Sequence, residues 1–409
     1  MIKAWTFMLY NAGQGQLARM ATHSLQELEK VGSDSRTDVV ALNYRETNGD
    51  CKYEGGHTYH LQAHGRPVER GPLGSMLSCA LANPARLKSP VLGQPVAAGD
   101  SAKMSDAATL KQFLIESMER FPAEHFALAI TGHGAAFQGQ VITRGPGGRA
   151  AISNDQLAEV LREVREETGH QVDLVNLNTC YSANLESLYS LKEATSTVVA
   201  SQDALAVATQ PFAAVLSQLQ TELKAGKSVG PAELGKMFVE QAAAQPAHQL
   251  HSPSLTAVDA RGLDELGQAV ARLQKECIAK GVRPAQLRQC LAEAVSVNFA
   301  DGVQLTDLGS LAAGLSQRFP ELREAATAVS QSLKQAVLAE QHATPADESL
   351  LSRLVRKVPG LVGKQKDLSG ATGLTVFWDA SQKERLDFIQ ASQFGRQHPI
   401  QDFMNYLEA

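Results

Sequence analysis

The sequence has 409 residues, of which 44% are hydrophobic and 20% are charged, as in ordinary soluble globular proteins. The net charge of −5 and the pI of about 6.1 argue against a nucleic-acid or acidic-membrane surface as the functional feature. Five cysteines without framework spacing, no signal-peptide pattern and no apolar run of about 18–20 residues lead us to expect a cytoplasmic protein without a membrane span.

The first 200 residues alternate between strand and helix patterns. The predicted strands are Trp5–Tyr10, Asp38–Tyr44, Phe126–Ile130, Val172–Asn178 and Thr197–Ala200. The predicted helices are Leu17–Leu28, Leu110–Phe121, Asn154–Glu167 and Ser182–Lys192, and Cys51–Leu61 is typical of a polar hairpin or strand extension. Strand–helix–strand units of this length predict a mostly parallel sheet covered by helices on both faces.

Local signals mark several helix ends. Ser105 or Asp106 is a candidate N-cap for the helix that follows. Ser153 and Gln156 form a capping-box pattern, and Gly169 stands where a C-cap glycine belongs. These signals predict helix boundaries on both sides of the intervening strands.

From about residue 212 the pattern becomes helix-rich. The predicted helices are Leu216–Leu223, Pro231–Ala244, Leu263–Lys280, Pro320–Gln341 and Gln401–Leu407. Two strand patterns interrupt them, at Ser254–Asp259 and Gly373–Trp378. We therefore expect an α/β core at residues 1–212 and a helix-rich region at 213–409 whose strands at 254–259 and 373–378 extend the sheet.

Two predicted strands carry a reactive side chain just past their carboxyl ends. One is followed by Thr131-Gly132-His133-Gly134 and the other by Thr179-Cys180. Ligands of open α/β sheets bind at that edge, so a histidine and a cysteine there are a candidate base and thiol nucleophile. The alternative is structural, because a lone cysteine in an apolar segment is usually an inert core residue.

Read together, these segments resemble the clostripain family of cysteine peptidases, within the caspase-like superfamily. The resemblance runs through six blocks in order, namely Trp5–Ala12, Thr109–Gly134, Asp173–Glu186, Val198–Gln202, Ser254–Asp259 and Gly373–Phe377, and the second block ends in the His133-Gly134 pair. It implies a caspase-like three-layer α/β/α sandwich with a mostly parallel sheet, and a cysteine endopeptidase that acts on a protein or peptide substrate.

By that resemblance Cys180 is the nucleophile and His133 the general acid/base, with the backbone N–H groups of Gly134 and Cys180 as the oxyanion site. A thiolate attacks, and a histidine donates a proton to the leaving amine near neutral pH. A glycine at position 134 suits close approach of a substrate carbonyl. No third catalytic residue is evident.

The substrate pocket departs from the family pattern. Relatives prefer arginine or lysine before the scissile bond and use acidic residues to bind it, at positions where this chain has Asn178 and Ala208. An asparagine cannot form the bidentate carboxylate pair that makes arginine recognition strong. Ser201 and Asp203 are further candidate substrate-binding residues. Asp203 either supplies the missing negative charge of the pocket or is simply a solvated loop acid.

The stretch Gln138–Ala150 is predicted to be an exposed, flexible, glycine-rich loop. Arg144 and Arg149 flank its Pro-Gly-Gly centre, which makes it a candidate site for activating cleavage by the enzyme itself or by an upstream protease. The alternative is an ordinary surface loop.

No cofactor or metal is expected. Cys51, His57, His60 and His64 fit no common structural zinc spacing, so exposed hairpin histidines are the favoured interpretation. Some relatives use calcium, but the sequence has no Asp-x-Asp-x-Asp-Gly loop.

Two other functions compete with the peptidase. One is a catalytically silent binding or scaffold protein on a caspase-like fold, which the presence of both His133 and Cys180 disfavours. The other keeps the thiol chemistry but performs acyl transfer or deamidation. Comparing hydrolysis of a peptide library with that of small thioesters and amides separates these functions.

Overall fold

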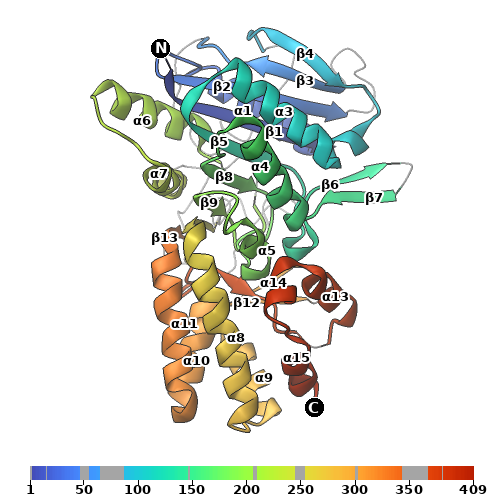
Figure 1. The fold of residues 1–409 in the computed structure, drawn as a ribbon, viewed down its shortest axis with the longest axis vertical. Helices are drawn as coiled ribbons and strands as arrows, with labels where there is room; N and C mark the ends of the chain where they lie inside the picture. Colours follow the sequence, from blue (N-terminus) through green and yellow to red (C-terminus); the bar gives the residue numbers. More distant parts are fainter. Residues whose placement is uncertain are drawn as a thin grey trace, which may run out of the picture.

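The computed structural model describes residues 2–14, 16–46, 55–64, 87–145, 148–205, 210–244, 254–299, 303–342, 367–379 and 381–409. Its centre is a nine-stranded sheet in the order β13-β10-β9-β8-β5-β1-β2-β3-β4 (Figure 1). These strands are β1 (Lys3–Gln14), β2 (Thr37–Glu46), β3 (Gly55–His60), β4 (Val91–Val96), β5 (Ala123–Thr131), β8 (Leu174–Asn178), β9 (Thr197–Ala200), β10 (Leu255–Asp259) and β13 (Val337–Gln341).

The sheet is mixed, with a parallel centre and antiparallel flanks. Strands β2, β1, β5, β8 and β9 run parallel to their neighbours within this set. Strands β3 and β4 on one side, and β10 and β13 on the other, pair antiparallel. The central strands are mostly apolar and buried on both faces because both faces are covered, as parallel sheets require.

Helices form a layer on each face of the sheet, which confirms the predicted α/β sandwich. One face packs against α1 (Gln16–Leu28), α6 (Phe212–Lys224) and α7 (Pro231–Ala244). The other packs against α3 (Ala107–Arg120), α4 (Asn154–Thr168), the short α5 (Leu185–Leu188) and the 3-10 turn η5 (Tyr189–Leu191). The other 3-10 turns among the described residues are η3 (Ser101–Ser105), η4 (Ala136–Gln138), η8 (Ala260–Gly262) and η9 (Pro320–Leu322).

A helix-rich lobe lies below the sheet in Figure 1. Its helices are α8 (Leu263–Ala279), α9 (Pro284–Glu293), α10 (Leu308–Arg318), α11 (Arg323–Ala336), α13 (Lys383–Ala391), α14 (Gln393–Gln397) and α15 (Gln401–Glu408). A separate three-stranded sheet joins β11 (Ser296–Asn298), β12 (Gln304–Asp307) and β14 (Thr375–Val376). The sequence patterns did not predict six of these elements, namely α9, α10, α13, α14, β11 and β12.

The capping signals are confirmed. Asp106 accepts a hydrogen bond from the backbone N–H of Ala108 at 3.0 Å and begins α3. Ser153 and Gln156 form the complete capping box of α4, which ends at Gly169 with φ of 72°, a left-handed conformation that favours glycine. These caps fix where the crossover helices begin and end, and therefore where the strands beside them emerge.

Three structural predictions were wrong. The stretch Gln138–Ala150 is not a flexible loop, because β6 (Gln140–Gly145) and β7 (Gly148–Ile152) pair there as an antiparallel hairpin. The helix predicted over Pro320–Gln341 ends at Ala336, and its last five residues form β13 against β10. The strand at 373–378 belongs to the smaller sheet rather than extending the large one.

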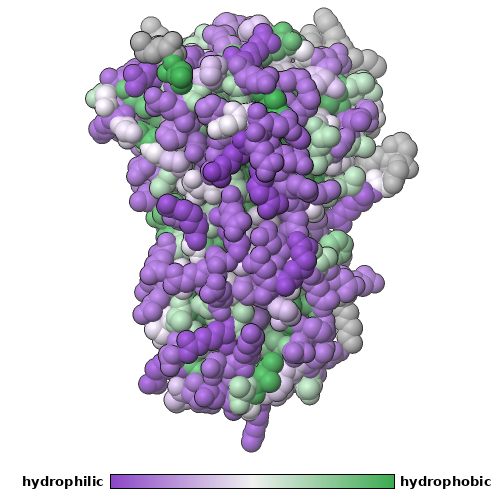
Figure 2. Space-filling view, viewed as in Figure 1, coloured by the Kyte–Doolittle hydropathy of each residue, from purple (hydrophilic) through white to green (hydrophobic). Residues whose placement is uncertain are grey.

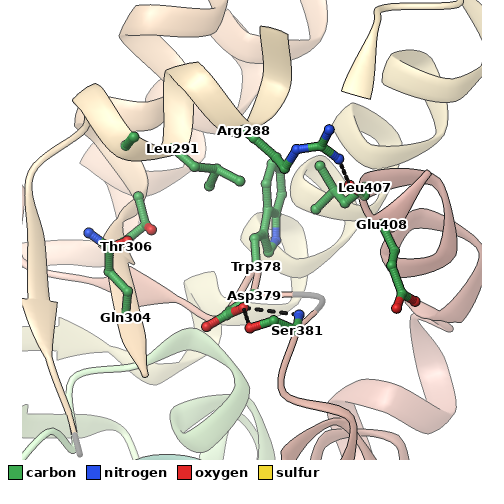
Figure 3. Close-up of a pocket in the computed structure, with 10 residues that line it drawn as sticks. Arg288, Leu291, Gln304, Thr306, Trp378, Asp379, Ser381, Leu407 and Glu408 are labelled. Carbon is green, nitrogen blue, oxygen red and sulfur yellow. Dashed lines mark hydrogen bonds between the residues drawn. The ribbon is translucent and has the colours of Figure 1, made fainter. Parts of the chain in front are cut away.

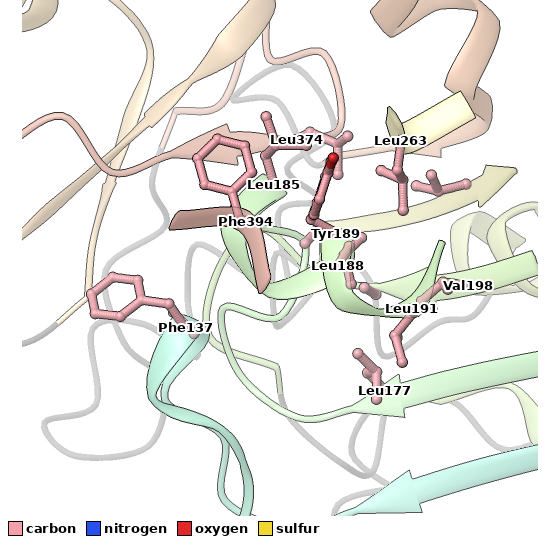
Figure 4. Packing of buried hydrophobic residues seen from close by; sticks show 14 of the residues in the cluster. Phe137, Leu177, Leu185, Leu188, Tyr189, Leu191, Val198, Leu263, Leu374 and Phe394 are labelled. Atoms are coloured by element: carbon pink, nitrogen blue, oxygen red, sulfur yellow. The ribbon is translucent and has the colours of Figure 1, made fainter. Parts of the chain in front are cut away.

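One hydrophobic cluster connects the sheet to the lower lobe. Figure 4 shows Leu177 and Val198 of the sheet, Leu188 and Tyr189 after the cysteine strand, and Phe394 of α14 packed together. Leu263 and Leu374 join the same cluster. Regions 1–212 and 213–409 therefore share buried side chains, and the boundary at residue 212 stays a prediction.

The face seen in Figure 2 is predominantly hydrophilic, with smaller green areas of hydrophobic residues between the hydrophilic ones. Within the described ranges, the large hydrophobic side chains that are exposed are Ile2, Val91 and Phe388. Over the same ranges, no helix is long and apolar enough to cross a membrane.

Candidate active site

Strands β5 and β8 are parallel neighbours, and their last residues, Thr131 and Asn178, are directly paired. His133 and Cys180 each follow two residues later, so this register delivers both to one edge of the sheet. His133 is exposed and Cys180 is half-buried. That edge is where open α/β sheets bind their ligands.

Gly134 lies against the cysteine segment. A Cβ atom at position 134 would stand 2.7 Å from the Cβ of Thr179 and 2.8 Å from the backbone oxygen of Cys180. No side chain fits at such distances, so the close approach of the two segments requires glycine here. The structure thus brings together the two segments that the sequence singled out.

The β6–β7 hairpin is attached to both segments. The backbone N–H of Ile142 donates to the carbonyl of His133 at 2.9 Å. The hydroxyl of Thr179 donates to Oε1 of Gln140 at 2.5 Å, and Nε2 of Gln140 donates to Asn154 at 3.0 Å. Because Gln140 is fully buried, these hydrogen bonds couple the hairpin to the residues beside His133 and Cys180.

The thiol of Cys180 is paired with a backbone segment that follows β9. The N–H of Leu205 donates to Sγ at 3.3 Å. Burial raises the pKa of Cys180, the negative charge of Asp203 raises it further, and the hydrogen bond from Leu205 opposes both. In this arrangement Cys180 is therefore held mainly as the neutral thiol.

The predicted substrate-binding residues are all buried beside the cysteine. Asn178 is fully buried, and its Nδ2 donates to the hydroxyl of Thr131 at 3.1 Å. Ser201 is fully buried, and its hydroxyl donates to the carbonyl of Asp203 at 3.0 Å. Oδ1 of Asp203 accepts the N–H of Ala204 at 2.7 Å. Ala208 lies outside the described residues.

Neutral polar side chains form a continuous row across four strands, two residues before the edge that carries His133 and Cys180. In the ladder, Asn43 of β2 pairs with Asn11 of β1, Asn11 with Thr131, and Thr131 with Asn178. All four are at most 3% exposed, and within the described chain Oδ1 of Asn11 and of Asn178 have no hydrogen-bond partner. The row contains no carboxylate.

The smaller sheet supports the segment after the nucleophile. The N–H of Thr375 in β14 donates to the carbonyl of Ala183 at 3.0 Å, and Nδ2 of Asn184 donates to the carbonyl of Thr375 at 3.4 Å. The N–H of Phe377 donates to Oε1 of Glu186 at 3.0 Å. Burial raises the pKa of Glu186 to about 7, against the lowering effect of this and other hydrogen bonds.

The described residues contain no group of three or more His, Cys, Asp or Glu side chains arranged to hold a metal ion. Cys51 lies outside them, His64 is exposed, and His57 is half-buried. His60 is half-buried too, with Nε2 at 2.8 Å from Oδ1 of Asp38, so the favoured interpretation of exposed hairpin histidines is wrong for His57 and His60.

A pocket of about 440 Å³ lies in the lower lobe rather than at this edge of the sheet (Figure 3). The guanidinium of Arg288 donates to the carbonyl of Leu407 there, and Asp379 accepts from Ser381. Its lining consists of Arg288, Leu291, Ala292, Gln304, Thr306, Trp378, Asp379, Ser381, Leu407 and Glu408. None of these belongs to the segments that carry His133 and Cys180, so the pocket is separate from the candidate active site.

The sequence comparison decides the family. The model of the clostripain family, Peptidase_C11, matches residues 88–360, which is more than half of the chain. The chain belongs to the clostripain family. It is accordingly a cysteine peptidase, and peptides or proteins are its substrates. No curated protein matches the sequence.

Solved structures of clostripain-family proteases share the fold. An inactive zymogen C11 protease from Parabacteroides distasonis superposes with a TM-score of 0.67 at 13% identity, over 97% of this chain and 99% of that one. A secreted C11 cysteine protease from Bacteroides thetaiotaomicron, in complex with an irreversible peptide inhibitor, gives 0.66 at 13% identity, over 98% and 100%. The caspase-like architecture inferred from the sequence is therefore confirmed.

Three residues that hold the site together were not predicted from the sequence. Leu205 gives no signal, because its contact with Cys180 joins positions 25 residues apart. Gln140 sits in a stretch that was interpreted as a loop. Glu186 does carry a signal, since it is the one charged residue in the Leu185–Leu191 segment, whose other residues are three leucines, two serines and a tyrosine.

Glu186→Gln tests the raised carboxyl pKa. Folding raises this pKa from 4.5 to about 7, so the folded state loses stability as the pH rises between these values. The loss is on the order of 3 kcal/mol above pH 7 and is absent below pH 4.5. Glutamine retains an acceptor for Phe377 without a charge, so the variant should melt at a higher temperature than the wild type at pH 8 and at a similar one at pH 5.

Glu193→Gln is the matched control, because Glu193 is exposed on the same segment and the substitution is the same. Melting temperatures of the three proteins should be measured by calorimetry at pH 5 and pH 8. An equal pH response in Glu186→Gln and wild type would contradict a buried, hard-to-ionise carboxyl.

Proposed function

We propose that this clostripain-family protein is an endopeptidase in which Cys180 attacks the scissile carbonyl and His133 acts as general acid/base. The observation that supports this most directly is the contact of Gly134 with Thr179 and Cys180 at the carboxyl edge of paired strands β5 and β8. From its residue type alone, Cys180 could be an inert core residue. A purely structural role, however, gives no reason for the segment that carries His133 to lie against it.

The reaction would proceed through a thioester. Sγ of Cys180 gives up its proton to His133 and forms a bond to the carbonyl carbon, and the oxygen becomes an oxyanion held by the N–H groups of Gly134 and Cys180. His133 then returns the proton to the leaving amine as the C–N bond breaks. Water, deprotonated by His133, hydrolyses the thioester and releases the acid product with the free thiol.

The row of neutral polar side chains formed by Asn43, Asn11, Thr131 and Asn178 affects which substrate side chain is accepted before the scissile bond. Asn178 occupies the position where the family resemblance places a pocket acid, and its neighbours Asn11, Asn43 and Thr131 are also neutral. These neutral side chains offer hydrogen-bond acceptors to a substrate arginine but no negative charge. Burying a guanidinium without a negatively charged partner is costly. We propose that any basic preference depends on Asp203.

Activation by cleavage in the β6–β7 hairpin is part of the proposal. Arg144 and Arg149 are paired across the hairpin, and Arg149 is exposed. The same strand, β6, is hydrogen-bonded to the carbonyl of His133 through Ile142. A cut between Arg144 and Arg149 would release β6 from its partner strand and thereby free His133 to adjust.

Cys180→Ala should abolish peptide hydrolysis and labelling by thiol-reactive peptide probes while the melting temperature stays near that of the wild type. His133→Ala should lower kcat by roughly 10²–10⁴-fold, the usual contribution of general acid–base catalysis. Cys290→Ala is the control, because it removes a thiol from α9, outside the site, and should retain activity. Hydrolysis at the wild-type rate by Cys180→Ala would end the proposal.

Asn178→Asp should shift specificity toward a basic residue before the cut, by about tenfold in kcat/KM if one charged hydrogen-bond pair is gained. The same change buries an unpaired carboxylate, so it should also lower the melting temperature without substrate. If the wild type already prefers arginine, Asp203→Ala should weaken that preference. An arginine preference indifferent to Asp203 in a peptide-library assay would show that this loop is not the pocket.

Replacing Arg144 and Arg149 with alanine should prevent activating cleavage. Wild type should convert to fragments of about 16 and 28 kDa, in proportion to the parts of the 43.8 kDa chain on either side of position 147, with activity rising as they form. The double variant should stay a single chain with low activity. Gel analysis and peptide hydrolysis over the same time course test this, and full activity in an uncut chain would rule processing out.

A further inference from the structure

The peptide group of Leu205 covers the thiol of Cys180. Its N–H donates to Sγ at 3.3 Å, and the thiol in turn donates to the carbonyl of the same residue at 3.8 Å. The side chain of Leu205 is only 7% exposed, so the residue is packed in place rather than projecting into solvent. Both backbone polar groups of one residue are thus engaged by the candidate nucleophile.

This contact is incompatible with attack on a substrate. A nucleophile needs a lone pair aimed at a carbonyl carbon about 3–3.5 Å away. In the structure the N–H of Leu205 takes the sulfur lone pair, and its peptide occupies space next to Sγ. Burial and the charge of Asp203 also raise the pKa of Cys180, which reduces the reactive thiolate.

The covering segment is fastened to the nucleophile's own turn. The N–H of Tyr181 donates to the carbonyl of Asp203 at 3.1 Å, and that of Ala183 donates to the carbonyl of Ser201 at 2.8 Å. Tyr181 has φ of 57°, a left-handed conformation that is costly for a residue with a side chain. The turn after Cys180 and the segment after β9 therefore hold each other in one arrangement.

We propose that residues 203–205 form an autoinhibitory strap that must leave Cys180 before a peptide substrate can be attacked. The inference rests on the proposed role of Cys180 as nucleophile. It differs from activation by cleavage, because the hairpin contacts His133 and Thr179, whereas the strap contacts the thiol itself.

The test follows alkylation of Cys180 by iodoacetamide, with peptide mapping by mass spectrometry. In native wild type, Cys180 should react much more slowly than in the denatured chain. Leu205→Pro removes the N–H donor that fastens the strap over Sγ, so native Cys180 should be alkylated faster, by about tenfold, the factor for one lost hydrogen bond. The same N–H lowers the pKa of the thiol, so the proteins are compared at a pH that ionises Cys180 in all of them. Leu205→Ala keeps both backbone groups and should react more slowly than Leu205→Pro.

Cys277 and Cys290 are internal controls, because both are buried in helices of the lower lobe. Their rates should be unchanged in Leu205→Pro. Equal native rates for Cys180 in Leu205→Pro and wild type would overturn the proposal. If Leu205→Pro unfolds and exposes all the cysteines, the comparison of native with denatured wild type decides. Equal alkylation rates of Cys180 in these two states would also overturn the proposal.

Asp203→Asn tests the electrostatic part separately. Asparagine retains an acceptor for the N–H of Ala204 but removes the charge that raises the pKa of Cys180, so the pH profile of alkylation should move to lower pH. An unmoved profile would remove Asp203 from the strap. Peptidase assays on the same samples separate the two proposals: faster alkylation without any activity in Leu205→Pro would count against Cys180 as nucleophile, not against the strap.

Discussion

The pairing of Thr131 with Asn178 at the ends of β5 and β8 is the constraint on which the candidate active site depends. Side chains alternate between the faces of a strand, so a slip of one residue would turn either His133 or Cys180 to the opposite face. Buried apolar residues on both strands, such as Leu128 and Ile130 of β5 and Val175 and Leu177 of β8, hold this register together with the hydrogen bond from Asn178 to Thr131. The capped helix α4 returns the chain between them to the correct edge. Gly134 can then approach Thr179 closely enough to exclude any larger residue.

The turn after Cys180 is held from two directions, and this explains why the lower lobe belongs to the site. The strap residue Asp203 binds Tyr181 from one side, and Thr375 of β14 binds Ala183 from the other. Leu185, Leu188 and Tyr189 continue from that turn into the cluster shared with α8 and α14. A turn with a left-handed Tyr181 is strained by itself, and such strain persists only where surrounding structure fixes it. The helix-rich lobe supplies part of that surrounding structure.

The sequence predicted the central strands and their capped helices because their signals are local. Runs such as Phe126–Ile130 are buried on both faces, and Ser153 with Gln156 fixes a helix start regardless of the rest of the chain. The failures share a different cause. Residues Val337–Gln341 read as a continuation of α11, and only their pairing with β10, about eighty positions earlier, makes them a strand. The Pro-Gly-Gly stretch read as a loop for the same reason, since nothing in its composition reveals the ladder between β6 and β7.

The difference between local sequence signals and long-range contacts also applies to the candidate active site. There the long-range contacts restrain the histidine and the cysteine separately. His133 and Cys180 could be singled out because each directly follows a strand, whereas Leu205 and Gln140 reach them only through the tertiary fold. Gln140 and Ile142 act on the histidine side through the hairpin, and Leu205 acts on the cysteine side through the strap. Cutting the hairpin changes the first set of contacts, whereas the hydrogen bonds that join the strap to residues 180–183 involve other segments of the chain. A processed chain would thus still protect its thiol until a substrate displaces Leu205, which limits both unwanted proteolysis and oxidation of the cysteine.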